Sequence, residues 1–415
     1  MSHKQISSSP STNKRDRTRE RLLEAAALEM NLMGAASLNL MDVGKAVGMS
    51  RNALYHYVKN RDDLIYQTYL RSVEALADNL TEARKREGTA KGQLRWLIEV
   101  QLAADRREQV VLKNSDALPP AERDIIEKLN NSNVQIICGI FTEGVKNGEF
   151  RQIDPAIATH VLLGLMDWAQ LWYRFTYGSS IKAIEKRAAA AIVVDQIMLK
   201  GIAASRSWLP AAAPYLEHIT ASNFDIFDGE YINERKRLRV IGAASAMFAR
   251  RGIEPTSLDD VAAAIKSTKG AVYHYFDNKT DLLLACYERT FDLFDLYINN
   301  AKVETDNPLD ELLVILNLHC QAHASPHPPL VPLARLSSLP ALQAERVVAI
   351  TQRLYKTQQA AVANKSCKIG SSAVIDLSLG ASVWVNKWLS DNPGVDARNL
   401  ASTICSIYSV GVLAG

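Results

Sequence analysis

The sequence has few cysteines and lacks any paired cysteine motif. Its five cysteines are scattered over 415 residues without a C-x-x-C pair, which fits a reducing compartment and argues against a disulfide scaffold or a zinc ribbon. Charge of either sign is nearly balanced, with 48 Lys and Arg against 45 Asp and Glu, so any basic surface must be local. Apolar runs are too short to span a bilayer, and the start lacks the apolar segment of a secretory signal. These absences predict a cytoplasmic protein without a membrane partner.

Motifs of catalysis and cofactor binding are also missing. The sequence contains no H-E-x-x-H, Walker loop, G-x-G-x-x-G or nucleophile elbow. A local cluster of His319, Cys320, His323 and His327 could suggest a metal, because His319 and His323 are one helical turn apart. No nearby carboxylate or second cysteine completes that site, however, and Pro326 ends the helix before His327. We therefore expect no enzyme activity, no cofactor and no metal.

The chain instead contains a long internal repeat. The stretch "LYHYVKN" (54–60) returns as "VYHYFDN" (272–278), 218 positions later. The same offset pairs Arg17 with Arg235 and Gly34 with Gly252 without a gap. Across residues 17–64, roughly a third of the paired positions are identical. An offset of this length indicates duplication of a whole domain or protomer rather than a solenoid repeat.

Each copy shows the same succession of helix signals. Apolar residues at helical spacing in residues 17–33 predict a first helix that ends at Gly34. Asn39 with Asp42, and Ser257 with Asp260, have the spacing of a capping box that opens a second helix. Ser50 and Thr268 then cap a third helix after a short turn, as in a helix-turn-helix. Asn60 and Asn278 open a fourth.

The Tyr-His-Tyr stretch suits a helix that contacts DNA. Residues of the first turn of such a helix read base edges, while hydroxyls, imidazoles and cations hold phosphates. The alternative is that one tyrosine of each pair packs against the first helix, which we favour for Tyr57 and Tyr275 but not for Tyr55 and Tyr273. The predicted DNA-binding residues are Ser50, Arg51, Asn52, Ala53, Tyr55, His56, Lys59 and Arg61 in the first copy, and Thr268, Lys269, Gly270, Tyr273, His274 and Lys279 in the second.

The segments "VGMSRNALYHYVKNRDDL" and "IKSTKGAVYHYFDNKTDL" both resemble the recognition segment of TetR-type transcriptional regulators. The resemblance covers the DNA-binding domain in each copy, and the second copy matches better because Gly270 is retained where the first has Asn52. It implies an all-α protomer in which a three-helix DNA-binding domain precedes a helical domain for effector binding and dimerisation. It also implies operator DNA and a small-molecule effector as partners.

Residues 65–200 and 283–415 are amphipathic without a strand pattern, which favours helical domains. The first resembles the ligand-binding half of relatives that respond to acyl-CoA thioesters or lipid catabolites, and the resemblance implies ligand contacts from Trp168, Trp172 and Tyr173. Packing of these aromatics in a helix–helix interface is the alternative. In the second half the Trp-Tyr-Arg element that follows Trp168 has become "VWVNKWLSDNPG" (383–394), which puts effector binding by that half in doubt.

The predicted organisation is therefore a single-chain pseudodimer. Its expected parts are a disordered basic arm (1–16), a first DNA-binding domain (17–64), a helical domain (65–200), a linker (201–233), a second DNA-binding domain (234–282) and a second helical domain (283–415). The expected function is a DNA-binding transcriptional regulator, a repressor released by an effector, with an architectural DNA-binding protein as the alternative. Association of two such chains is left open.

Overall fold

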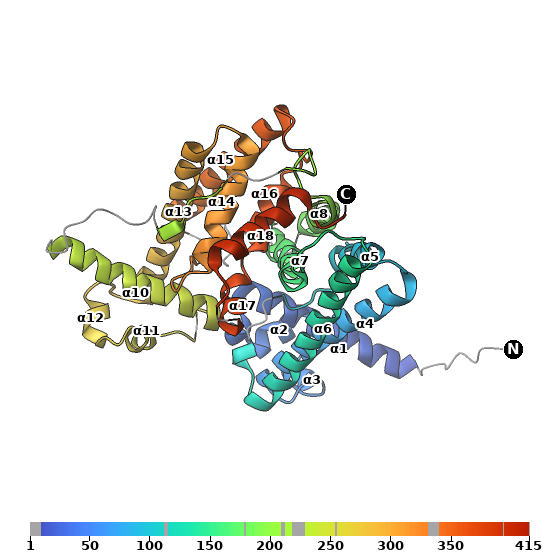
Figure 1. The fold of residues 1–415 in the computed structure, drawn as a ribbon. Helices are drawn as coiled ribbons and strands as arrows, with labels where there is room; N and C mark the ends of the chain where they lie inside the picture. Colours follow the sequence, from blue (N-terminus) through green and yellow to red (C-terminus); the bar gives the residue numbers. More distant parts are fainter. Residues whose placement is uncertain are drawn as a thin grey trace. The chain divides into compact units, whose positions relative to one another are not determined.

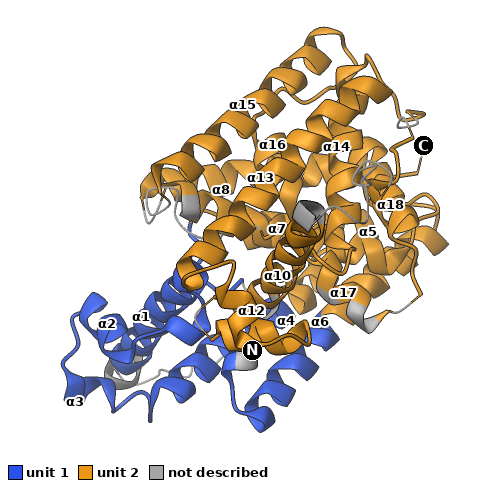
Figure 2. Cartoon of the chain, turned by 90° about the vertical axis from the view of Figure 1, so that its left-hand side faces the viewer, with its two compact units in different colours: residues 1–78, 105–133 blue, residues 79–104, 134–415 orange. Residues whose placement is uncertain are grey.

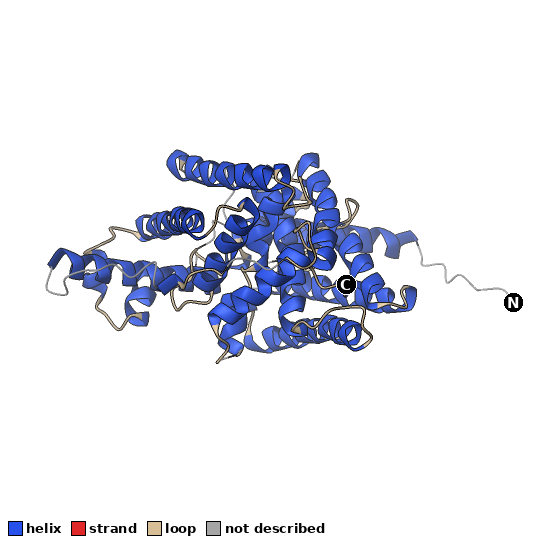
Figure 3. Cartoon of the chain, turned by 45° about the horizontal axis from the view of Figure 1, so that its top comes forward, coloured by secondary structure: helices blue, strands red, loops and turns tan. Residues whose placement is uncertain are grey.

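The computed structural model describes residues 10–111, 115–177, 180–208, 212–217, 229–253, 255–330, 340–392 and 394–414. Within these ranges the chain is helical, and β-structure is limited to two isolated bridges, Phe150 with Leu413 and Ala203 with Cys367 (Figures 1 and 3). None of the described helices combines the length and the apolar character needed to cross a membrane. The predicted all-α fold class is confirmed.

The helices form two series that follow the repeat. The first series is α1 (Pro10–Met33), α2 (Leu40–Ala46), α3 (Arg51–Leu54), α4 (Arg61–Arg86), α5 (Ala90–Leu102), α6 (Pro120–Lys146), α7 (Pro155–Tyr177) and α8 (Ile181–Lys200). The second series is α10 (Gly229–Arg251), α11 (Leu258–Ala264), α12 (Lys269–Tyr273), α13 (Lys279–Glu304), α14 (Pro308–His323), α15 (Ala341–Ala363), α16 (Ala373–Ser378), η4 (Leu379–Ala381), α17 (Val385–Asp391) and α18 (Ala397–Val410).

Two compact units make up the chain (Figure 2). Residues 1–78 and 105–133 form the first unit, which contains α1 to α3 and the beginning of α4. Residues 79–104 and 134–415 form the second unit, which contains α10 to α18 together with α5, α7 and α8. The second unit therefore brings helices from both halves of the sequence together.

The helix caps follow the predicted pattern in both copies. Asn39 accepts hydrogen bonds from the backbone N–H groups of Met41 and Asp42 at the start of α2. Ser257 forms the complete reciprocal capping box with Asp260 at the start of α11. These bonds satisfy N–H groups that a helix leaves without intrahelical partners, which is why the second helix begins where the sequence predicts.

The turn between the second and third helices has the same backbone in both copies. Gly48 adopts a φ of 74° in the first, and its counterpart 218 positions later, Lys266, adopts a φ of 54°. The same substitution recurs after α6 and α15, where Gly148 has a φ of 74° and Lys365 a φ of 63°. Left-handed backbone is unfavourable for lysine, so these two lysines occupy a conformation required by the fold.

Two predicted boundaries differ from the structure. The segment 1–16 was expected to be a disordered arm, but α1 begins at Pro10, so its last residues are helical. The linker was expected to span 201–233, but Ile202 and Ala203 are buried and α10 begins at Gly229. Residues 209–211 and 218–228 of that segment lie outside the described residues.

The segment after α8 donates backbone hydrogen bonds to the last turn of α18, and the segment after α18 donates to the last turn of α8. The four bonds are Ile202 N–H to Tyr408 O, Ala203 N–H to Ser409 O, Val412 N–H to Met198 O and Leu413 N–H to Leu199 O, with lengths of 2.8–3.0 Å. The donors Ile202 and Val412 are 210 positions apart, and so are their acceptors, Tyr408 and Met198. The other two bonds are related in the same way. Reciprocal bonding of this kind is also found in two-fold, self-complementary interfaces between identical subunits.

A glycine pair sits where α7 meets η4. A Cβ placed on Gly164 would lie 2.1 Å from the carbonyl oxygen of Gly380 and 2.8 Å from Cδ1 of Trp384. A Cβ placed on Gly380 would lie 2.7 Å from Cβ of Trp168. Since each glycine is covered by the tryptophan of the other half, the two backbones approach each other closely and reciprocally.

This pairing corrects one sequence interpretation. Gly164 and Gly380 are equivalent at an offset of 216 residues, and the same offset matches Trp168 with Trp384 and Trp172 with Trp388. When the two halves are compared at an offset of 218 residues, the tryptophans do not align, and the match is missed. The second half has therefore kept both tryptophans, and Leu389 and Ser390 stand where the first half has Tyr173 and Arg174.

Candidate nucleic-acid interface

The third helix of each copy presents matching side chains to solvent. Tyr55 is 45% exposed and Tyr273 is 42% exposed, and the histidine after each tyrosine is exposed as well. The next apolar positions, Val58 and Phe276, are buried. The hydroxyl and imidazole groups at the exposed positions therefore lie on the surface, where they are accessible to DNA phosphates.

Tyr57 and Tyr275 are half-buried, which agrees with the packing role favoured for them. The hydroxyl of Tyr275 donates a 2.7 Å hydrogen bond to Oδ1 of Asn233 on α10. The main-chain carbonyl of Tyr57 accepts from the side chain of Gln67 on α4. These residues fix the third helix against its neighbours.

The caps of the third helices leave a donor available. Oγ of Ser50 accepts from the N–H of Ala53, and Oγ1 of Thr268 accepts from the N–H of Ala271, each at 3.3 Å. A hydroxyl that accepts at a cap can still donate its own proton. Ser50 and Thr268 can thus combine a structural role with a phosphate contact.

The positions predicted to read bases differ between the copies. Arg51 and Asn52 are exposed at the start of α3. Lys269, at the start of α12, is paired with Asp259 at 3.0 Å, with 62% of the lysine side chain and 58% of the aspartate side chain exposed. This ion pair and the nearby hydroxyphenyl ring of Tyr273 raise the pKa of Lys269. The counterpart of Asp259 in the first copy is Met41, which cannot form such a pair.

Arg61 and Lys279, which we predicted to contact DNA, make hydrogen bonds within the protein. The guanidinium of Arg61 donates to the main-chain oxygens of Leu38, Ala35 and Ala36 at 2.5–2.9 Å. Lys279 donates at 3.2 Å to the oxygen of Ile253, the counterpart of Ala35. Both cations therefore hold the loop after the first helix to the start of the fourth, a constraint that caps and periodicity do not reveal.

Lys59, which we also predicted to contact DNA, is exposed in the turn before α4. Its backbone N–H donates a 2.7 Å bond to Oδ2 of Asp63, which leaves its ammonium group on the surface. Gly270 is exposed, with open space where a Cβ would lie. Ala53 is half-buried beside the cap.

The predicted effector-binding aromatics lie where α7 meets α16. Nε1 of Trp168 donates a 2.9 Å hydrogen bond to the main-chain oxygen of Asp376, and the Tyr173 hydroxyl lies 3.4 Å from Oδ2 of the same residue. Tyr355 on α15 also donates to this carboxylate. The helix–helix interface, our alternative interpretation, thus describes Trp168 and Tyr173, and a ligand contact from these residues or from Trp172 stays a prediction.

Asp376 is the interface residue that sequence reasoning missed. Burial raises the pKa of its carboxyl, while hydrogen bonds from Tyr355, Trp172 and Tyr173 partly oppose that change. Its counterpart at the 216-residue offset is His160, which stacks on Trp384 with ring centroids 4.9 Å apart. Only the shifted alignment of the tryptophans could have singled out this position.

The histidines singled out in the sequence lie on α14 and in the segment directly after it. His319 and His323 are neighbours, with ring centroids 4.6 Å apart. Across the described residues, however, no three His, Cys, Asp or Glu side chains lie close enough together to hold an ion. Both imidazoles belong to the interior of the second helical domain, where they are 2% and 5% exposed.

Comparison with known proteins identifies both kinds of domain. Residues 240–286 match the family model described as bacterial regulatory proteins, tetR family, and residues 87–195 match the model described as tetracyclin repressor-like, C-terminal domain. The first match falls on the second DNA-binding copy, and the second falls on the helical domain of the first half.

Individual relatives cover parts of the chain. The Transposon Tn10 TetC protein of Escherichia coli is 37% identical over 59 residues, which span 14% of this chain and 30% of that protein. The fatty acid metabolism regulator protein of Bacillus subtilis is 24% identical over 153 residues, or 35% of this chain and 78% of that protein. Among solved structures, apo AibR is 21% identical with a TM-score of 0.36, covering 42% of this chain and 97% of that one.

The helix-turn-helix geometry, its exposed polar residues and the two matched domain types agree with one another. The chain is a DNA-binding transcriptional regulator that belongs to the TetR family.

Proposed function

We propose that this chain acts as its own dimer, in which two TetR-like protomers bind the two halves of one operator. The observation that carries the proposal is the reciprocal interface, in which the segment after each of α8 and α18 donates backbone hydrogen bonds to the last turn of the other helix. An interface of this kind normally joins two identical subunits. When both sides belong to one chain, a single chain supplies both DNA readers.

The proposed operator has unequal halves. A homodimer presents the same side chains to both half-sites, whereas a fused chain can present different ones. Arg51 and Asn52 suit guanine and adenine edges respectively. Lys269 is a point charge engaged with Asp259, and Gly270 has no side chain to read a base. The first half-site should thus carry more base discrimination, while binding of the second depends more on the backbone.

Selection of binding sites from random DNA tests this proposal. We expect two different half-sites, and Arg51→Ala should relax specificity in one of them by roughly 1–3 kcal/mol per lost base contact. Lys269→Ala should lower affinity more evenly across sequences and reduce the dependence on salt. A perfect palindrome with equal information in both halves would contradict the divergence, and a single recovered half-site would contradict the pseudodimer.

We further propose that the protein is a repressor released by a small-molecule effector. The effector would favour a helical-domain conformation that no longer supports operator binding. The similarity of a 153-residue stretch of the chain to a regulator named for fatty acid metabolism supports an acyl compound, such as an acyl-CoA, as one effector class. Footprinting on the DNA that flanks the protein's own gene, with and without acyl-CoAs, tests it. An architectural DNA-binding protein would show the same footprint in both conditions.

A further inference from the structure

The two DNA-binding copies carry opposite charges just after the third helix. Lys59 follows this helix in the first copy, and its side chain is exposed. The counterpart 218 positions later is Asp277, which is exposed as well. Both residues lie a few positions after the tyrosine and histidine that we predict to hold phosphates. At this point of the predicted DNA-binding surface, the first copy therefore presents a positive charge and the second copy a negative one.

The start of the third helix differs in the same direction. In the second copy, Lys269 forms its 3.0 Å ion pair with Asp259. In the first copy, Met41 occupies the position of Asp259, and exposed Arg51 occupies that of Lys269. An ion pair between exposed side chains contributes little to folding stability. Its carboxylate nevertheless competes with DNA phosphates for the lysine, so Asp259 weakens the attraction of the second copy to DNA.

The first helix adds cations in the first copy alone. Lys14 and Arg15 are exposed on α1, and Nη2 of Arg15 lies 3.5 Å from the main-chain oxygen of His56, a residue predicted to hold a phosphate. Ile232 and Asn233 occupy the equivalent positions of α10. The cationic surface around the third helix of the first copy thus has no equivalent at these positions of the second.

All three differences favour phosphate binding by the first copy. Affinity for the DNA backbone rises with the number of phosphates that lysines and arginines neutralise. Exposed charges act over a Debye length of about 10 Å at 0.1 M salt, so an acidic residue next to the third helix opposes the cations around it. The second copy should therefore bind DNA weakly unless another part of the chain already holds it nearby.

We propose that the first DNA-binding copy binds DNA first, and that Asp259 and Asp277 weaken the second copy so that it binds only after the first has docked. This inference rests on the proposed function, in which one chain supplies both DNA readers. Covalent linkage makes the second binding step intramolecular, and its effective concentration compensates for the weak attraction to phosphates. Such a second copy adds little affinity for non-specific DNA, which a genome offers in large excess.

Exchange of residues between equivalent positions tests the charge effect in the full chain. Asp259→Met and Asp277→Lys give the second copy the residues of the first. For a non-specific duplex, we expect each to steepen the dependence of log K on log salt concentration by up to about 0.9. The reverse exchange, Lys59→Asp, should flatten it. Fluorescence-anisotropy titrations at several salt concentrations measure these slopes. Unchanged slopes in both second-copy variants, or no flattening in Lys59→Asp, would overturn the inference.

Footprinting tests the order of binding. On an operator whose second half-site is scrambled, the wild-type chain should still protect the first half-site. When the first half-site is scrambled instead, the second should stay unprotected. A double variant with Asp259→Met and Asp277→Lys should protect the second half-site on that DNA. Protection by the wild-type chain whichever half-site is scrambled, or no gain of protection in the double variant, would refute the proposed order.

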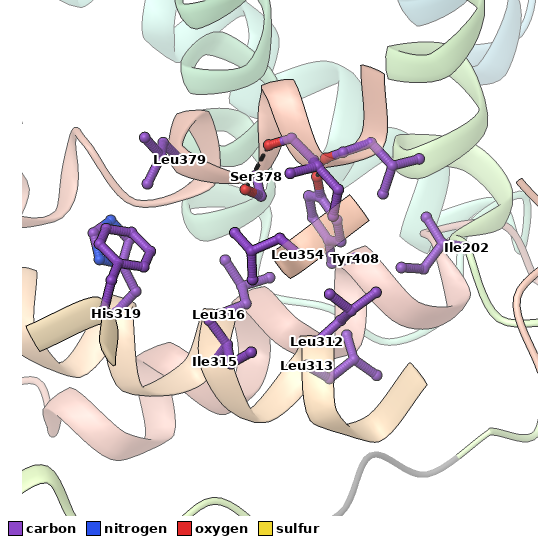
Figure 4. Close-up of a pocket in the computed structure, with 13 residues that line it drawn as sticks. Ile202, Leu312, Leu313, Ile315, Leu316, His319, Leu354, Ser378, Leu379 and Tyr408 are labelled. Carbon is purple, nitrogen blue, oxygen red and sulfur yellow. Dashed lines mark hydrogen bonds between the residues drawn. The ribbon is translucent and has the colours of Figure 1, made fainter. Parts of the chain in front are cut away.

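A substitution in the interior of the second half controls for altered folding. Leu316 lines a small cavity of the second helical domain with Leu312 and His319 (Figure 4), and Leu316→Val removes apolar contacts there without changing any charge. This variant should keep the wild-type salt dependence, and a changed slope would contradict the charge effect. His319 is less suitable, because neither ring nitrogen has a hydrogen-bond partner among the described residues and its replacement removes a titratable group.

Operator binding by the wild-type chain separates this inference from the proposed function. Specific operator binding, together with unchanged slopes in the charge variants, would sink only the proposed order of binding. Absence of specific operator binding would sink the proposed function itself, while the slopes on non-specific DNA would still report on the charge effect.

Discussion

The close approach of α7 and η4 at Gly164 offers a direct test of the intrachain interface. In Gly164→Ala, the new methyl carbon would lie 2.1 Å from the carbonyl oxygen of Gly380, whereas real Cβ atoms essentially never come within 3.0 Å of a neighbour. The two backbones must therefore separate by about 1 Å. The nearby Trp384 ring, 2.8 Å from the same position, must move as well.

Two opposing effects determine how much Gly164→Ala changes the free energy of unfolding. Alanine favours a helix interior over glycine by about 1 kcal/mol. Overpacking of a close contact costs typically about 1–3 kcal/mol. Gly139→Ala on α6 is the matched control, because a Cβ there would meet only Nη2 of Arg84 at 3.7 Å, an ordinary contact. Gly139→Ala should therefore show the helix gain alone.

The free energy of unfolding in urea, followed by tryptophan fluorescence, measures the difference. Trp168 and Trp384 cover the two glycines, so the signal reports on this interface. We expect Gly164→Ala to be less stable than Gly139→Ala by about 1–3 kcal/mol. Equal stability of the two variants would show that the halves do not pack closely here, and the reasoning for an intrachain dimer would lose its structural basis.

Three further changes have defined outcomes. Tyr55→Phe and Tyr273→Phe should each weaken operator binding by about 1 kcal/mol, the net value of one hydrogen bond, without affecting folding; unchanged affinity of both in gel shifts would remove the phosphate role. Lys365→Gly should raise the free energy of unfolding by about 1 kcal/mol, because it relieves left-handed backbone, and a loss of stability in urea would contradict this. Burial lowers the pKa of His323 to about 4, so its contribution should be complete above pH 6.5 and decline by about 3 kcal/mol as the pH falls to 4. His323→Phe should flatten that part of the stability profile, and a wild-type profile flat over this range would disprove the buried neutral state.

Local signals predicted the DNA-binding copies well, because their determinants lie close together in sequence. Asn39, Ser257 and the caps of the third helices act on N–H groups two or three residues ahead, so spacing alone reveals them. Tyr55 directly follows buried Leu54, and successive helical residues point about 100° apart, so Tyr55 faces away from the core. The hydrogen bonds of Arg61 within the protein were not foreseen, because its acceptors lie 23–26 residues away, beyond the range of any cap or period.

The interface between the halves was harder to foresee because its residues come from distant segments. Trp168 and the carbonyl of Asp376 are 208 positions apart, and the offset that relates the halves changes along the chain, from 218 to 216 to 210 residues. A comparison at one fixed offset therefore aligned Trp168 with Asn386 instead of Trp384. The unpartnered state of His319 depends on what surrounds it in three dimensions, and no pattern along α14 encodes that.

The equivalent positions of His160 and Asp376 illustrate what the proposed fusion of two protomers permits. In a homodimer, one side chain must suit both copies of the interface, since the two-fold axis repeats it. Here the carboxylate of Asp376 accepts hydrogen bonds from Tyr173 and Trp172, whereas His160 stacks on Trp384. Each residue matches the aromatic pair it meets, and the tyrosine that donates to Asp376 is replaced by Leu389 on the other side. In a homodimer, a mutation at this position would appear on both sides of the interface, so one side chain would have to suit both partners. The two sides can therefore diverge together within one chain, and the same freedom extends to Arg51 and Lys269, which we predict to contact DNA in the two copies.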